Sequence, residues 1–121
     1  MRRLAHVFKA LSDETRLTIL ALVFRHGQLC VCEVEQILGI TQSKASRHLR
    51  YLRAAGVLED ERDGLIMNYR VARAPDAELG AVLVTLRALL AGRPVPEARQ
   101  LLVQLRATRA EGRLQPAVEP T

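Results

Sequence analysis

The sequence predicts a mainly α-helical domain with one small β-hairpin, arranged as a winged helix-turn-helix. Apolar residues recur at helical spacing over most of the 121 residues. In the middle of the chain, segments 31–38 and 42–55 form two helical patterns joined by a tight, glycine-containing turn, which is the helix-turn-helix arrangement. Directly after them, two short strand-like segments flank a dipeptide typical of hairpin turns. A hairpin in that place is a wing.

The composition indicates a helical core and an anionic partner. Aromatic residues make up 3% of the chain and tryptophan is absent, so the core must consist of leucine, valine, isoleucine and alanine. The chain has 18 basic and 13 acidic residues, a formal net charge of +5 and a pI near 10.0. Such a balance favours an anionic partner such as nucleic acid.

Two helices are predicted ahead of the helix-turn-helix. The spacing i, i+3, i+4, i+7 of the first is occupied by Leu4, Val7, Phe8 and Leu11. Ser12 is the expected N-cap of the second helix, and Gly27 is its expected end. The second helix places Asp13 and Glu14 in its first turn, where negative charge is favourable.

The boundaries of the central helices and of the hairpin also follow from single residues. Gly39 is expected to end the helix over 31–38, and Thr41 is expected to cap the helix over 42–55, which ends at Gly56. The hairpin strands are predicted at 57–62 and 65–71, on either side of the turn Asp63-Gly64.

Two more helical patterns follow, one from Asp76 to Gly92 and one behind Pro94. Their apolar surface either completes the core of a monomer or forms a dimer interface. Because small helical DNA readers commonly use two-fold symmetry, we expect a homodimer. Residues 1–107 are thus predicted to form one DNA-binding and dimerisation domain. Residues 108–121 lack periodicity and are predicted to be a disordered tail.

One face of the helix over 42–55 concentrates the positive charge. Between residues 42 and 53 no acidic residue occurs. Arginine can hold a guanine edge, glutamine can read adenine, and serine or lysine can bind phosphates. A solvated amphipathic helix is the alternative, but we expect this face to contact double-stranded DNA. The predicted contacts are Gln42, Ser43, Lys44, Ser46, Arg47, His48 and Arg50, with Arg62 in the wing.

Three segments of the chain resemble the ArsR family of metalloregulatory repressors, and its arsenical-resistance members in particular. Residues 8–20 (FKALSDETRLTIL) are similar to the family's opening signature, residues 29–34 (LCVCEV) to its metal-binding box, and residues 42–49 (QSKASRHL) to its recognition helix. The resemblance spans about residues 4–71. It implies a homodimeric repressor that occupies an operator until an inducer binds.

The resemblance further implies that the inducer is arsenic(III), held by thiolates ahead of the recognition helix. Cys30 and Cys32, the two cysteines of the chain, match the first two of three such cysteines, and Glu35 stands at the third position. Arsenic(III) prefers thiolates, so a carboxylate is a poor substitute. With two sulfurs it can keep an exogenous third ligand, or a methylated arsenical can bind whose carbon fills that valence.

The spacing of the cysteines suggests how binding would act. Residues two apart on a regular helix lie about 200° apart around its axis, so two thiolates can hold one ion only if the turn distorts. We expect this distortion to misalign the recognition helices and to lower operator affinity. Alternatively, Cys30 and Cys32 are small buried apolar residues without a ligand.

The sequence is also compatible with functions other than arsenic sensing. A repressor of the same fold that responds to thiol oxidation is the main alternative, and a ligand-free architectural DNA binder is another. A divalent-cation sensor is disfavoured because His6, His26 and His48 show no ligand spacing. No catalytic arrangement or phosphate loop is visible, so neither an enzyme nor an organic cofactor is expected. The sequence shows no targeting or membrane segment, and we expect a cytoplasmic protein with reduced thiols.

Overall fold

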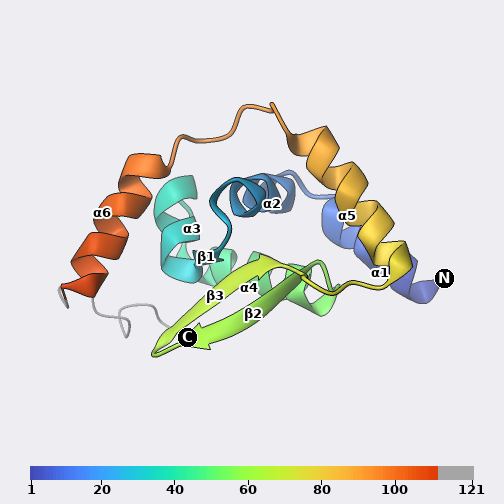
Figure 1. The fold of residues 1–121 in the computed structure, drawn as a ribbon, viewed down its shortest axis with the longest axis horizontal. Coiled ribbons are helices and arrows are strands. Elements are labelled where there is room, and N and C mark those ends of the chain that lie inside the picture. The colour runs from blue at the N-terminus through green and yellow to red at the C-terminus, as the bar shows by residue number, and fades with distance from the viewer. Residues whose placement is uncertain (112–121) are drawn as a thin grey trace.

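The computed structural model describes residues 1–111, which form a bundle of helices on a small sheet (Figure 1). The helices are α1 (Arg2–Leu11), α2 (Glu14–His26), α3 (Val31–Leu38), α4 (Gln42–Ala54), α5 (Ala77–Leu90) and α6 (Arg99–Ala110). The strands are β1 (Leu29–Cys30), β2 (Leu58–Asp63) and β3 (Ile66–Val71). The mainly helical winged helix-turn-helix architecture is therefore confirmed. Within the described part of the chain, no helix combines the length and apolar character needed to cross a membrane.

The helix ends largely follow the predicted capping residues. Thr41 caps α4 by accepting the backbone N–H of Lys44, and Gly39 ends α3 in the left-handed conformation, with φ of 65°. The predicted cap of α2 was wrong by one residue. Asp13 accepts the backbone N–H of Arg16 at 2.9 Å. The hydroxyl of Ser12 instead donates to a carbonyl at the end of α1.

The sheet contains a strand that the sequence pattern did not predict. Its order is β1-β3-β2, and both strand pairs are antiparallel. Strand β1 has two residues, too few to show an alternating pattern, and its Cys30 pairs with Asn68 of β3. The hairpin is confirmed, but its two-residue turn is Gly64-Leu65, because Asp63 pairs with Ile66. Gly64 supplies the positive φ, 65°, that such a turn requires.

The core is aliphatic, as the composition predicts. Helix α2 runs through its centre, where Ile19, Leu20 and Leu22 are fully buried. Helix α4 adds Leu49 and Leu52, also fully buried. Helices α1 and α5 pack at one end of the molecule and α6 lies at the other end, beside α3 (Figure 1). The core therefore lies between α1 and α5 at one end and α6 at the other.

The last helix differs from its prediction at both ends. It begins at Arg99, not directly behind Pro94, and residues 93–98 have no regular secondary structure. Pro96 explains this, because a proline disfavours the helical conformation of the residue before it, here Val95. Helix α6 continues to Ala110, beyond the predicted domain boundary at 107. The remainder of the predicted tail, 112–121, lies outside the described residues.

Candidate DNA-binding surface and thiol site

Helix α4 presents its polar residues on one face and its apolar residues on the other. Ala45, Leu49 and Leu52 are fully buried against the core. The predicted DNA contacts that the structure leaves exposed are Ser43, Lys44, Arg47 and Arg50, and Gln42 and Ser46 are half-buried beside them. None of the three cations in this set forms an ion pair with a carboxylate of residues 1–111. The exposed face of α4 therefore carries positive charge that is not neutralised within this part of the chain.

His48 lies apart from this exposed face, in the contact between α2 and α4. Its Nδ1 is 3.4 Å from Nη1 of Arg16 and 3.9 Å from Oδ2 of Asp13. Burial lowers the pKa of His48 below its usual value of 6.5; Asp13 opposes this effect, and Arg16 adds to it. Arg16 also stacks on the ring of Tyr51, 4.3 Å from its centroid. His48 is therefore neutral at pH 7, and it lies between α2 and α4.

Arg62 is exposed in β2, opposite Met67 of β3. The acidic residues around it are partly neutralised. Arg70 pairs with Glu59 at 3.0 Å and with Glu61 at 2.7 Å. The backbone N–H of Arg73 and the guanidinium of Arg70 lower the pKa of Glu59 to about 2. The negative charge of the wing is therefore smaller than the number of its acidic residues suggests.

The two cysteines lie where β1 ends and α3 begins. Cys30 is the N-cap of α3 and has extended backbone angles, φ of −98° and ψ of 170°, while Cys32 lies in the first turn. Both are buried, with 0% and 9% of their surface exposed, and they form a small apolar cluster with Ile66 of β3. Because Cys30 is outside the helix, the 200° separation expected on a regular helix does not apply to this pair. The expectation that ligation must distort a helical turn was wrong on that point.

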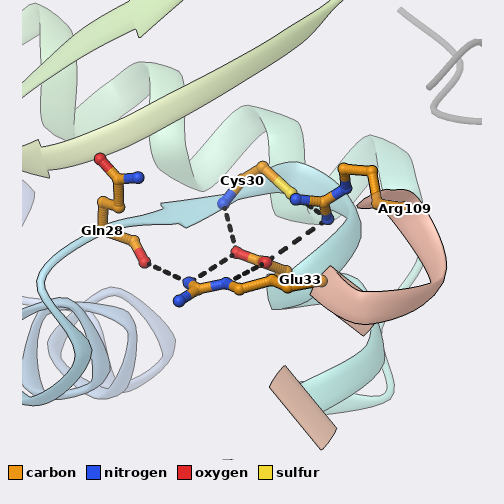
Figure 2. A network of polar contacts seen from close by, with 5 residues as sticks. Gln28, Cys30, Glu33 and Arg109 are labelled. Carbon is orange, nitrogen blue, oxygen red and sulfur yellow. Dashed lines mark hydrogen bonds and ion pairs between the residues drawn. The ribbon is translucent and has the colours of Figure 1, made fainter. Parts of the chain in front are cut away.

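A buried carboxylate, that of Glu33, lies beside Cys30 (Figure 2). Only 1% of Glu33 is exposed. Its Oε1 accepts the backbone N–H of Cys30 at 3.0 Å, which completes a capping box at the start of α3. Burial raises the pKa of Glu33, but hydrogen bonds from Arg106 and from the Cys30 backbone, together with the charge of Arg109, outweigh it. The pKa therefore lies below its usual 4.5, and Glu33 is ionised at neutral pH.

The cationic partners of Glu33 come from α6. Nε of Arg106 lies 2.9 Å from Glu33 Oε2, and Nη2 of Arg106 also donates to the carbonyl of Gln28 at 3.0 Å. Nη2 of Arg109 is 3.4 Å from Glu33 Oε2 and 3.4 Å from Sγ of Cys30. Sequence reasoning missed this group of residues. The three-residue spacing from Cys30 to Glu33 was a readable sign of the capping box, but no local pattern linked α3 to α6.

Glu35, which stands at the position of a third thiolate in the resemblance, does not complete a metal site. It is half-buried on α3. Among residues 1–111, no three histidine, cysteine, aspartate or glutamate side chains are gathered so that they could hold a metal ion. Cys30 and Cys32 therefore remain the candidate protein ligands.

An apolar surface lies over α1 and α5. Two large apolar side chains are exposed there, Phe8 at 55% and Leu89 at 58%. Leu11 and Leu86 line a shallow groove between them. Contiguous exposed apolar surface of this kind marks protein interaction sites.

Comparison with known sequences identifies similar proteins. Residues 13–60 match the family described as bacterial regulatory protein, arsR family. An arsenic resistance transcriptional regulator, ArsR1 of Pseudomonas putida, is 49% identical over 65 residues, which cover 54% of this chain and 51% of that protein. The arsenical resistance operon repressor of Escherichia coli is 46% identical over 66 residues, 54% of this chain and 56% of the repressor. A cadmium resistance regulatory protein, a CadC homolog of Staphylococcus aureus, is 42% identical over 54% of each chain. The chain thus spans about half the length of these relatives.

Solved structures share the fold. A homodimeric winged helix-turn-helix DNA-binding domain, Mb0332 of Mycobacterium bovis, superposes with a TM-score of 0.61 at 27% identity, covering 73% of this chain and 78% of that one. Reduced HlyU of Vibrio cholerae gives a TM-score of 0.59 at 27% identity, covering 74% and 90%. Rv0081 of Mycobacterium tuberculosis is 30% identical with a TM-score of 0.55, covering 88% and 91%.

Proposed function

We propose that this chain, whose residues 13–60 form a helix-turn-helix domain of the arsR family of bacterial regulatory proteins, is a homodimeric transcriptional repressor that arsenic(III) releases from its operator. The relatives are transcriptional regulators of arsenic or cadmium resistance and not enzymes. The inducer binds at Cys30 and Cys32, and the protein acts in the cytoplasm. The observation that carries the proposal is the position of Cys30, which belongs to the wing sheet and caps α3 at the same time.

In the DNA complex, α4 enters the major groove with its exposed face toward the bases. Lys44, Arg47 and Arg50 are free to exchange water for phosphates and base edges, since no carboxylate of residues 1–111 competes for them. The apolar surface over α1 and α5 supports a dimer, which would bring two copies of α4 to successive major grooves, about 34 Å apart. The wing adds Arg62.

Inducer binding couples to DNA through the two elements that the cysteines join. Arsenous acid exchanges two hydroxyl groups for two sulfurs, so that two As–O bonds break, two As–S bonds form and two waters leave. A change in the separation of the sulfurs that exceeds what rotation of the two side chains allows would move β1 against α3. Strand β1 is paired with β3 of the wing, and α3 packs on α4. A coupling of about 1–3 kcal/mol between the two sites would lower operator affinity about 5- to 150-fold.

The proposal is tested by titrating arsenite against the repressor bound to a fluorescent operator, which the protein first selects from random duplexes. Native protein is expected to dissociate, whereas Cys30→Ser and Cys32→Ser bind the operator and do not dissociate. Val31→Ala, which changes the residue between the two thiols and keeps both, serves as the matched control. Release that is unchanged in both serine variants would overturn the proposal.

A repressor that responds to oxidation is the second candidate. The guanidinium of Arg109 lies against the sulfur of Cys30, and a neighbouring cation favours the thiolate, which is the form that oxidants attack. The same titration with hydrogen peroxide separates the two candidates, since release by peroxide and not by arsenite selects this second one.

A further inference from the structure

We infer that Arg109 recognises the oxygen ligand that arsenic(III) keeps when two thiolates bind it, so that the site distinguishes arsenite from arsenicals with carbon in that position. The inference rests on the proposed function and assigns it a further residue. Arg109 belongs to α6, outside the segment that matches the arsR family. It is therefore a feature of this chain's own C-terminal helix.

Arg109 reaches the thiol site from α6. Figure 2 shows its side chain extending from α6 toward Cys30 and Glu33. Its Nη2 lies 3.4 Å from the sulfur of Cys30, and 20% of the side chain is exposed. The guanidinium therefore lies beside the sulfur to which arsenic would bond.

One donor of Arg109 is available for such a ligand. Its Nε is buried and has no hydrogen-bond partner among residues 1–111. Buried donors without an acceptor are rare in native proteins and call for an explanation. Glu33 does not provide an acceptor for Nε, since its oxygens already receive the Cys30 N–H, Arg106 and Nη2 of Arg109. A hydroxyl group on bound arsenic would supply the missing acceptor.

The charge at this place also favours an oxygen ligand. The single carboxylate of Glu33 faces two guanidiniums, those of Arg106 and Arg109. The pKa of Arg106 is raised, chiefly by its hydrogen bond to Glu33, and arginine side chains are not deprotonated in proteins. One positive charge therefore remains beside the cysteines, and it attracts an electron-rich oxygen more than a hydrocarbon group.

Two arsenicals differ in the third ligand that arsenic keeps after two thiols have bound it. Arsenous acid loses two hydroxyl groups as water when it binds two thiols, and it keeps the third hydroxyl on trivalent arsenic. Phenylarsine oxide binds two thiols by losing its oxygen as water, and its third valence is a carbon. Only the first product offers an acceptor to Nε of Arg109.

The test measures both arsenicals on the operator complex of native protein and of Arg109→Gln. We expect Arg109→Gln to need about tenfold more arsenite for half-release, the effect of one lost hydrogen bond to a charged donor. The loss of the cation beside the Cys30 thiolate affects both arsenicals, so the concentration for half-release is expected to rise clearly less for phenylarsine oxide than for arsenite. The matched control is Arg99→Gln, an exposed arginine at the start of α6, which should change neither response. Arg109→Lys keeps the charge but not the Nε donor, and it should resemble Arg109→Gln.

Each other outcome is informative. An equal loss for both arsenicals, no loss for either, or full rescue by Arg109→Lys overturns the role of the Nε donor. Ultraviolet absorbance of the As–S bonds, measured on the protein without DNA, shows whether a loss of release arises in binding; a loss of release with unchanged binding also overturns the inference. A native protein that binds neither arsenical overturns the proposed function itself, and the inference with it.

Discussion

Arginine has opposite surroundings on α4 and on α6. Arg47 and Arg50 of α4 are exposed and have no carboxylate partner among residues 1–111. Arg106 and Arg109 of α6 share one carboxylate, that of Glu33, which is 1% exposed. The first pair leaves its charge available to a polyanion, and the second uses its charge to attach a distant helix to the thiol site.

The difference predicts where substitutions act. An exposed arginine without an ion pair contributes little to folding, so its replacement should change DNA binding and leave stability almost unaltered. A buried carboxylate with two guanidiniums is costly to disrupt, because its partners lose the group that compensates them. Stability and DNA affinity should therefore respond to different arginine clusters.

The largest effect is expected for Glu33→Gln. This change removes the charge that holds Arg106 and Arg109 and should lower the free energy of unfolding by about 2–3 kcal/mol, somewhat below the range for fully buried pairs because 41% of the Arg106 side chain is exposed. Urea unfolding followed by circular dichroism measures it. Glu35→Gln, on the same helix and half-buried, should change stability by less than about 0.5 kcal/mol. Equal losses of stability in Glu33→Gln and Glu35→Gln would show that the ion pairs of Glu33 with Arg106 and Arg109 do not stabilise the fold.

The next largest effect concerns α4. Arg47→Gln and Arg50→Gln should each weaken operator binding by about 1–2 kcal/mol, since each removes a cation from the exposed face of α4 that we propose contacts DNA. Unfolding free energies should stay within about 0.5 kcal/mol of native. Fluorescence anisotropy at two salt concentrations measures the binding, and Arg99→Gln on α6 is the control. If both α4 variants bind as tightly as native protein, the exposed face is not the DNA surface.

The same contrast explains what the sequence could predict. The exposed face of α4 follows from residues within one helix, whose spacing alone decides which side chains share a face. Helix caps at Thr41 and Gly39 are equally local. Those features were predicted, and the boundaries of α3 were predicted to the residue.

The thiol site depends on contacts that local patterns do not encode. Glu33 and Arg109 are 76 residues apart, and the contact arises only because α6 packs beside α3. Strand β1 is defined by its pairing with β3, not by any periodicity of its own two residues. The pair Cys30 and Cys32 could therefore be found from the sequence, but its surroundings could not.

A smaller effect is expected in the pH dependence of stability. The pKa of Glu33 in the folded protein lies below its usual 4.5, so the stability contributed by its charge is present above that value and is lost as pH falls through the folded pKa. The stability difference between native protein and Glu33→Gln should be constant near neutral pH and shrink at acid pH. Urea unfolding at a series of pH values measures it. A difference that does not shrink on acidification would mean that packing, and not charge, accounts for the effect.

The smallest effect is expected in the wing, at Arg62. Its exposed side chain is flanked by Glu61, which Arg70 already engages, and by the exposed Asp63, whose charge opposes DNA phosphates. Arg62→Gln should therefore weaken operator binding by only about 0.5 kcal/mol and reduce the salt dependence by at most about one phosphate contact. Asp63→Asn should strengthen binding by a similar amount, because it removes the opposing charge. Salt-dependent anisotropy measures both changes, and a loss at Arg62 as large as at Arg47 would show that the wing contributes as much to DNA binding as α4.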